Sequence, residues 1–165
     1  MRYYSGFGFW GEKELFKDYL EDDEFTIAGF SYGAQKALID AVHTTKRVDK
    51  LQLLSPAFFP KNPKFAKLQI NAYKKDKNSY IKNFVENVKY PKEINIEKYL
   101  DDTELYQLEE MFEFNWGLIE YAKKRKIEIE VFIGEKDKII DVKKALEFFK
   151  NYGKVYFIKD VGHLL

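Results

Sequence analysis

Apolar runs of four to six residues mark five short strands along the chain. Each is bounded by glycine, proline or polar residues, which is typical of strands separated by turns. The predicted strands lie at about residues 1–5, 25–29, 49–54, 128–133 and 154–158. In two of them apolar and polar residues alternate: Leu51 and Leu53 lie on one side of the strand and Gln52 on the other, and likewise Ile129 and Val131 against Glu130. This alternation is typical of a sheet with one solvated face.

Apolar residues at helical spacing occupy most of the remaining chain. No β pattern occurs between Pro56 and Lys126, so this stretch is predicted to be an all-helical insertion. The predicted organisation is one α/β domain with a mostly parallel sheet, a core at residues 1–55 and 127–165, and an insertion at 56–126. The predicted helices cover Glu12 to Leu20, Tyr32 to about Thr45, Lys64–Lys75, Ser79–Val88 and Thr103–Lys124.

The predicted strand order has a consequence for the two faces of the sheet. If the strands lie side by side in sequence order, right-handed crossovers place every connecting helix on the same face. The other face would then be bare. We therefore expect that face to be either wet or covered by a second copy of the chain in a homodimer.

Composition narrows the classes of function. The 165 residues are 45% hydrophobic and 18% aromatic, which predicts one folded domain. No apolar run is long enough for a membrane span, and residues 1–5 lack a signal-peptide pattern, so a cytoplasmic protein that binds no membrane is expected. With no cysteine and only two histidines, a metal site is unlikely and no cofactor is expected.

The net charge of +1 predicts no nucleic-acid partner, but it hides an uneven distribution. Residues 60–92 carry nine lysines and two acids, and residues 93–113 carry eight acids and one lysine. The two strips could simply neutralise each other. Alternatively, the basic strip is a docking surface for an acidic partner, whose encounter it would steer. The candidate docking residues are Lys61, Lys64, Lys67, Lys74, Lys75 and Lys82.

A Gly-x-Ser-x-Gly sequence lies between the second predicted strand and the following helix. Gly29 and Gly33 flank Ser31, and glycines allow the tight backbone turn that exposes a serine hydroxyl above a sheet. The helix that starts at Tyr32 would aim its free N–H groups at an oxyanion formed there. An ordinary strand-to-helix turn is the alternative interpretation of this motif alone.

The two histidines have different prospects as a base for Ser31. His43 lies about three turns along the helix that Ser31 begins, too far to reach back, and is interpreted as a helix-end residue. His163 directly follows the last predicted strand, and Asp137 follows the fourth. The order Ser, Asp, His at the ends of successive strands is that of α/β-hydrolase triads. Asp141 is a second candidate acid; Asp137 is favoured because it directly follows its strand.

A glycine-rich bend follows the first predicted strand. Ser5-Gly6-Phe7-Gly8 could supply a second oxyanion donor beside the nucleophile, or it could be a plain turn. In the insertion, aromatic residues could line an acyl pocket, although a helical aromatic stripe is more often part of a core. Phe112 and Trp116 belong to this group.

Four segments together resemble the functional loops of an α/β-hydrolase: Ser5-Gly6-Phe7-Gly8, Gly29-Phe30-Ser31-Tyr32-Gly33, Gly134-Glu135-Lys136-Asp137 and Gly162-His163. The chain is similar to the short, atypical BioV type of pimeloyl-acyl-carrier-protein methyl ester esterase in biotin synthesis, which is related in chemistry to BioH. Phe65-Ala66-Lys67-Leu68-Gln69 resembles a Phe-x-x-Leu-Gln run on the first lid helix of BioH-like esterases, which borders the acyl site.

The resemblance implies a role for each matching residue. Ser31 would be the nucleophile, His163 the base and Asp137 the orienting acid, with the backbone N–H groups of Phe7 and Tyr32 as the oxyanion hole. It also implies an acyl carrier protein as partner, and substrate contacts from Phe65, Leu68 and Gln69. Phe112 and Trp116 are added as substrate contacts from the aromatic residues of the insertion.

The sequence departs from the usual hydrolase pattern in the part that precedes Ser31. Ser5 stands where His-Gly normally opens the oxyanion loop, and only about two dozen residues separate that loop from Ser31. Two other functions stay open: another serine acyl hydrolase, such as a general carboxylesterase or an acyl thioesterase, and a non-catalytic binding protein derived from a hydrolase.

Overall fold

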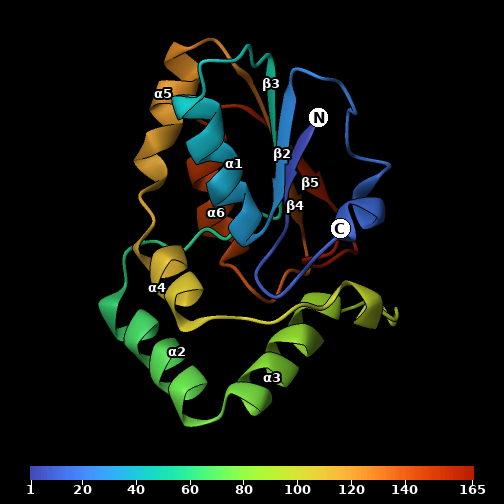
Figure 1. Cartoon of the computed structure of the whole chain (residues 1–165), viewed down its shortest axis with the longest axis vertical. Helices are drawn as coiled ribbons and strands as arrows, with labels where there is room; N and C mark the ends of the chain where they lie inside the picture. The colour runs from blue at the N-terminus through green and yellow to red at the C-terminus, as the bar shows by residue number, and fades with distance from the viewer.

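Five parallel strands form a single sheet in the order β1-β2-β3-β4-β5 in the computed structural model, which describes residues 1–165 (Figure 1). Every strand pairs in parallel with its neighbour in the sequence. The predicted parallel sheet of about five strands is therefore confirmed, with ends within about two residues of those expected. The strands are β1 (Arg2–Tyr4), β2 (Thr26–Phe30), β3 (Lys50–Leu54), β4 (Glu128–Gly134) and β5 (Lys154–Ile158).

Three helices cover one face of this sheet: α1 (Tyr32–His43), α5 (Ile119–Lys124) and α6 (Val142–Phe149) (Figure 1). Ile27, Leu53 and Val131 point to this side and belong to a core cluster of 18 buried residues. Burial of these aliphatic side chains is the main force that holds the helices on the sheet. α1 begins at Tyr32, as predicted, and ends at His43, two residues before the predicted end near Thr45; α6 was not anticipated from the sequence.

The opposite face is covered, which corrects the prediction of a bare face. The connection from β1 to β2 crosses this face and contains the 3-10 helix η1 (Glu12–Phe16), whose Phe16 packs with Phe30, Leu54 and Phe132 in a second core cluster. The chain steps in the same direction from β1 to β2 as from β2 to β3, but the two connections lie on opposite faces. The two connections therefore have opposite handedness. The irregular β1–β2 connection departs from the right-handed rule, which describes helical crossovers best.

Polar groups complete the covering of the second face. Gln52 is buried, and its amide group donates to the Glu130 carboxylate and to the Tyr19 carbonyl while it accepts the Glu21 N–H. The Tyr156 hydroxyl donates to the other oxygen of Glu130. The polar side of β3 and β4 is thus paired within the chain rather than with water. A homodimer through this face stays a prediction, with less open surface than the sequence suggested.

Two predicted helices are interrupted in the structure. The stretch expected to be one helix over Thr103–Lys124 divides into α4 (Leu105–Glu113), the 3-10 helix η3 (Trp116–Leu118) and α5. The break falls at Asn115, whose side chain accepts the Gly117 N–H and caps η3. The helix expected over Glu12–Leu20 is only the 3-10 helix η1, followed by turns.

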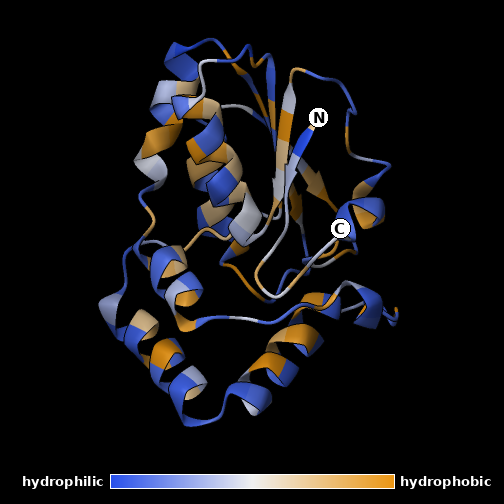
Figure 2. Ribbon diagram, in the orientation of Figure 1, coloured by the Kyte–Doolittle hydropathy of each residue, from blue (hydrophilic) through white to orange (hydrophobic).

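The insertion lies across the C-terminal ends of the strands (Figure 1). It contains α2 (Pro63–Lys75), α3 (Lys77–Lys89), the 3-10 helix η2 (Glu97–Tyr99) and α4, and it returns to the sheet through η3 and α5. Figure 2 shows apolar residues concentrated on the strands, whereas α2 and α3 mix polar and apolar residues. Ile119 and Ala122 of α5 belong to the main core cluster, so the last part of the 56–126 stretch packs with the body.

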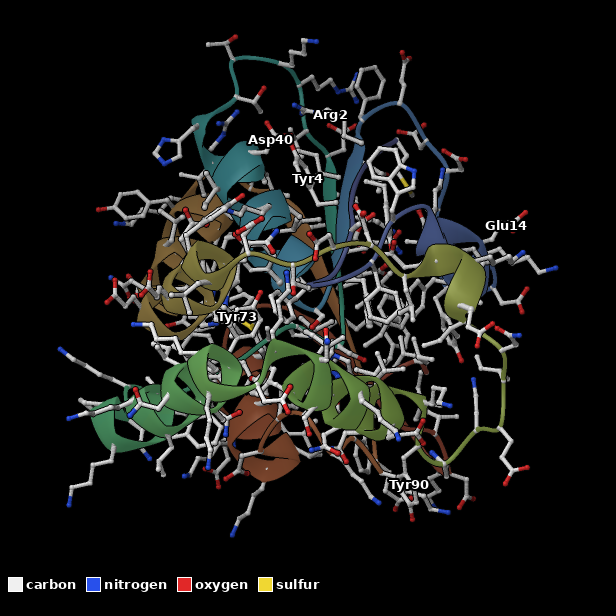
Figure 3. The ribbon with its side chains drawn as sticks, turned by 60° about the horizontal axis from the view of Figure 1, so that its bottom comes forward. Arg2, Tyr4, Glu14, Asp40, Tyr73 and Tyr90 are labelled. Atoms are coloured by element: carbon white, nitrogen blue, oxygen red, sulfur yellow. The ribbon has the colours of Figure 1, made fainter.

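Buried or half-buried polar contacts tie these layers together. On β1, Arg2 and the Tyr4 hydroxyl both bind the Asp40 carboxylate of α1, at 2.8 and 2.9 Å, and the three side chains converge in Figure 3. In the insertion, the Tyr73 hydroxyl of α2 donates to the Thr103 carbonyl at 2.7 Å. No helix of the structure has the length and apolar character that crossing a membrane requires.

Candidate active site

Ser31 stands on a sharp turn between β2 and α1. Its backbone has φ 53° and ψ −115°, a region that non-glycine residues rarely adopt. Gly29 and Gly33 are required around this turn because a Cβ at Gly29 would overlap the Gly33 carbonyl, and one at Gly33 would overlap the Tyr4 carbonyl. The Ser31 N–H donates to the Leu54 carbonyl at 2.9 Å, which fixes the turn against β3. This strained turn is the geometry of a nucleophile elbow.

Ser31, His163 and Asp137 form a chain of hydrogen bonds. His163 Nε2 lies 2.9 Å from Ser31 Oγ, and His163 Nδ1 lies 2.6 Å from Asp137 Oδ2. All three residues are buried, with exposed fractions of 2%, 0% and 9%. Asp137 fixes the tautomer in which Nδ1 carries the proton, so Nε2 is free to accept the Ser31 proton. The structure therefore brings together the three residues that the sequence singled out as a triad.

The structure also distinguishes the two candidate acids. The second oxygen of Asp137, Oδ1, accepts the N–H groups of Ile139 and Ile140 at 2.7 and 3.3 Å, which holds the carboxylate in place. Asp141 instead caps the N-terminus of α6 by accepting the Lys144 N–H at 3.1 Å. This backbone hydrogen bond lowers the pKa of Asp141 below its ordinary value. Asp141 contacts no residue of the hydrogen-bonded chain.

The loops that carry Asp137 and His163 are bound to each other. The Lys136 N–H donates to the Val161 carbonyl at 2.8 Å, and the Lys136 ammonium pairs with Asp160 at 2.6 Å. Gly134 has no side chain to hold the His163 loop away, since a Cβ there would overlap the Gly162 carbonyl. These contacts fix the distance between the loop of Asp137 and the loop of His163, and so help to hold the two side chains in place.

Two backbone N–H groups in the segments that meet at the Ser31 turn have no acceptor within the protein. One belongs to Phe7, in the loop after β1, and the other to Tyr32, the first residue of α1. A buried N–H without a partner is uncommon, and two such groups next to a nucleophile can bind the negative oxygen of a tetrahedral intermediate. The helix N-terminus at Tyr32 adds its partial positive charge. Both residues were named from the sequence for this role.

A polar link joins the nucleophile turn to the insertion. The Tyr32 hydroxyl and the Lys36 ammonium both donate to Oε2 of Glu110 on α4, each at 2.5 Å. Burial, followed by the hydrogen bond to Glu110, raises the pKa of Tyr32 to about 12. The Lys36 and Tyr32 hydrogen bonds lower the pKa of Glu110. The link therefore consists of a neutral tyrosine, an ionised carboxylate and an ammonium group.

An apolar cluster lies between Ser31 and the insertion. Its buried members are Phe7 and Tyr32 at the nucleophile turn, Ala57 after β3, and Tyr73, Leu108 and Met111 of the insertion. Phe59 and Phe112 pack against this cluster and are only partly buried. Ser31 is only 2% exposed, and electrostatic interactions are stronger in such buried surroundings than in water.

A groove of about 1010 Å³ opens beside this cluster. Its walls come from the segment after β3, from α2, from the end of α4 and from α6, and none of the three triad residues lines it. Phe59 and Phe112 belong to both the groove wall and the apolar cluster near Ser31. The six aromatic residues of the groove are Phe58, Phe59, Phe112, Phe114, Trp116 and Phe148.

Of the five residues predicted to contact substrate, two line the groove and three do not. Phe112 and Trp116 line the groove, and Phe65 packs on Phe112 with ring centroids 5.7 Å apart. Leu68 is 67% exposed and does not line the groove. Gln69 accepts the Tyr80 hydroxyl at 3.0 Å, which joins α2 to α3.

The six candidate docking lysines are all exposed, and none of them forms an ion pair. They separate into two groups. Lys61, Lys67 and Lys74 line the groove, where Glu113 is the one acidic residue of the wall. The other three, Lys64, Lys75 and Lys82, lie outside it.

The sequence did not reveal two buried polar residues near the site. Gln35 of α1 donates from Nε2 to the Ala57 and Met111 carbonyls, at 2.9 and 3.0 Å, and so joins the nucleophile helix to the insertion. Glu12 is fully buried beside the loop of Phe7. The burial of Gln35 could have been suspected, because it lies beside the alanine-rich apolar stripe of the same helix. Nothing in the spacing marked Glu12, because its burial depends on the unexpected path of the β1–β2 connection.

Solved structures share the fold of this chain at low sequence identity. BioG from Haemophilus influenzae aligns with a TM-score of 0.62 and 13% identity, over 99% of this chain and 87% of that one. An alpha/beta hydrolase fold protein from Burkholderia ambifaria aligns with a TM-score of 0.57 and 15% identity, over 84% of this chain. The protein has the α/β-hydrolase fold. The fold predicted from the loops is thereby confirmed.

The α/β-hydrolase fold is present here in a shortened form. A carboxylesterase of the ammonia-oxidizing thaumarchaeon Nitrososphaera gargenis aligns with a TM-score of 0.59 and 11% identity over 94% of this chain. The chain spans 66% of the length of that carboxylesterase and 59% of the Burkholderia protein. No protein-family model and no curated protein sequence matches the chain.

Proposed function

We propose that the protein is a serine carboxylesterase. The observation that carries this proposal is the continuous hydrogen-bonded chain from Ser31 Oγ to His163 Nε2 and from His163 Nδ1 to Asp137 Oδ2. A serine hydroxyl becomes a nucleophile when a base can remove its proton and an acid orients that base. The two free N–H groups beside Ser31 supply the charge stabilisation that acyl transfer also needs.

The reaction follows from this geometry. His163 Nε2 accepts the proton of Ser31 as Oγ attacks the ester carbonyl carbon, and the N–H groups of Phe7 and Tyr32 bind the resulting oxyanion. His163 returns the proton to the departing alcohol when the carbon–oxygen bond breaks, which leaves an acyl-enzyme on Ser31. Water, deprotonated by His163, then releases the acid.

The proposed substrate is the methyl ester of pimeloyl-acyl-carrier protein, in biotin synthesis. The resemblance of the four loops to BioV-type esterases suggests it, and the groove supports it physically. An aromatic wall suits an apolar acyl arm, and unpaired Lys61, Lys67 and Lys74 at the same groove suit an acidic carrier protein. Such a substrate also contains a thioester, so the insertion must hold the carrier end away from Ser31.

Mass-spectrometric turnover of this substrate tests the proposal directly. We expect loss of one methyl group with the thioester intact, and no turnover by Ser31→Ala, because removal of the nucleophile costs orders of magnitude in kcat. Cleavage at the thioester would identify another acyl hydrolase. Substantial turnover by Ser31→Ala would contradict the assignment of the nucleophile.

Two lysine triples test the docking of a carrier protein. Replacing Lys61, Lys67 and Lys74 by alanine removes the charges at the groove, and replacing Lys64, Lys75 and Lys82 removes the same net charge outside it. We expect the first triple to raise KM for the carrier-protein substrate more than the second, with kcat and activity on a small ester unchanged. Salt should raise the wild-type KM, since it screens exposed charges. Equal effects of the two triples would contradict docking at the groove.

A further inference from the structure

Glu12 is a fully buried acid whose carboxyl group faces the loop after β1. Its Oε1 atom accepts the Gly6 N–H at 2.9 Å and the Tyr3 hydroxyl at 3.1 Å. Its Oε2 atom is also buried and has no hydrogen-bond partner. Burial, and secondarily the Glu12 carboxyl group, raises the pKa of Tyr3 above its ordinary value, so the tyrosine remains a neutral donor.

The residue that Glu12 holds is adjacent to an oxyanion donor. Gly6 directly precedes Phe7, whose N–H has no acceptor within the protein and is assigned above to the proposed oxyanion hole. On its other side Gly6 packs against the Phe30 ring so closely that a Cβ would lie 2.6 Å from a ring carbon. The loop is therefore held between the Glu12 carboxyl group and the residue that precedes Ser31.

A purely structural role does not explain this acid. A buried carboxyl group with an unpaired oxygen costs free energy, and an apolar side chain of similar size would avoid that cost. The contacts that an apolar residue could not make are the two hydrogen bonds to Oε1, and one of them fixes the backbone next to Phe7. Residues that lower stability in this way are concentrated at functional sites.

We propose that Glu12 is a positioning residue of the active site: its carboxyl group holds the Gly6 N–H so that the Phe7 N–H points at the oxyanion formed on Ser31. The inference rests on the proposed function, because the oxyanion exists only if Ser31 attacks an acyl group. In this proposal Glu12, on the β1–β2 connection, orients the loop after β1, which lacks the usual His-Gly opening.

Kinetics of three variants test this role on a small ester such as p-nitrophenyl butyrate. Glu12→Gln keeps an oxygen acceptor and is expected to retain kcat within about three-fold. Glu12→Leu removes the acceptor, and we expect kcat to fall about 10- to 100-fold with KM nearly unchanged, less than the loss caused by deleting an oxyanion donor outright. Glu14→Gln is the matched control, since Glu14 lies on the same 3-10 helix, points outward in Figure 3 and should leave both constants unchanged.

The amide resonance of Gly6 gives a readout that does not depend on activity. A hydrogen bond to a carboxyl oxygen moves the proton resonance downfield and slows its exchange, so Glu12→Leu should shift it upfield and Glu12→Gln should shift it less. An unmoved Gly6 resonance, or a Glu12→Leu variant that unfolds more easily but has wild-type kcat, would overturn the inference. A wild-type protein without esterase activity would refute the proposed function, and the Gly6 resonance would still decide whether Glu12 anchors the loop.

Discussion

Replacement of Asp137 by asparagine isolates the role of the acid in the triad. Asparagine has nearly the same shape, and its side-chain oxygen can still accept the N–H groups of Ile139 and Ile140. Its NH2 group would then face His163 Nδ1, where the aspartate oxygen now lies at 2.6 Å. To accept that hydrogen bond, Nδ1 must lose its proton, so the neutral ring carries the proton on Nε2. In this tautomer His163 cannot accept the proton of Ser31.

The expected loss follows from the loss of the base. In triads of this kind the wrong tautomer lowers kcat about 10⁴-fold, which corresponds to about 5.4 kcal/mol of transition-state stabilisation. The free energy of unfolding should change much less, because the backbone hydrogen bonds to the side-chain oxygen are kept. The assay is kcat for a p-nitrophenyl ester, with thermal unfolding of each variant measured in parallel.

Asp141→Asn provides the matched control. Asp141 is four residues away, caps α6 and touches no triad residue, and asparagine caps helices as well as aspartate does. We expect wild-type kcat and nearly wild-type stability for this variant. The assignment of Asp137 would be refuted if Asp137→Asn kept more than about a tenth of the activity, or if Asp141→Asn lost as much, since either result conflicts with the tautomer argument.

Three further predictions address the surroundings of the site. Gly33→Ala should cost about 3 kcal/mol or more, or prevent folding, because the new methyl group would overlap the Tyr4 carbonyl; urea denaturation measures this. Glu130→Leu should cost about 3 kcal/mol in the same assay, because it leaves buried donors on the second face unpaired; a neutral effect would contradict this. Tyr32 has a folded pKa of about 12, above its ordinary value of 10, through burial and Glu110, so its contribution to stability is complete below pH 10 and is lost as pH rises toward 12. The melting temperature of Tyr32→Phe should therefore fall less than that of the wild type between pH 10 and pH 12. An equal fall for both proteins would contradict a stabilising contact between Tyr32 and Glu110.

The sequence was sufficient to predict the parallel sheet and the three residues that the structure joins by hydrogen bonds, for a local reason. Each strand is a short apolar run, and the ends of parallel strands meet at one edge of the sheet. Ser31, Asp137 and His163 each follow such a run, so the residues that the loops bring together could be named without the tertiary structure. The glycines of the elbow carried the same information about the backbone.

The path of the β1–β2 connection could not be predicted, because it depends on distant partners. Its residues resemble an amphipathic helix in spacing, but the structure contains only η1 and turns there. What holds the segment on the second face is Gln52, which binds the Tyr19 carbonyl and the Glu21 N–H from 33 and 31 residues away. The break at Asn115 depends in the same way on packing, since Trp116 must turn into the core to reach Phe149.

The β1–β2 connection contacts both the second face of the sheet and the candidate site. Phe16 of η1 contacts Phe30, with ring centroids 4.7 Å apart, and Phe30 in turn contacts His163, at 5.1 Å. Glu12, one turn earlier, binds the Gly6 N–H of the proposed oxyanion loop. One short segment therefore covers the second face of the sheet, binds the proposed oxyanion loop through Glu12, and reaches His163 only through Phe30. The covering of the second face and the position of the proposed oxyanion loop therefore depend on the same short segment.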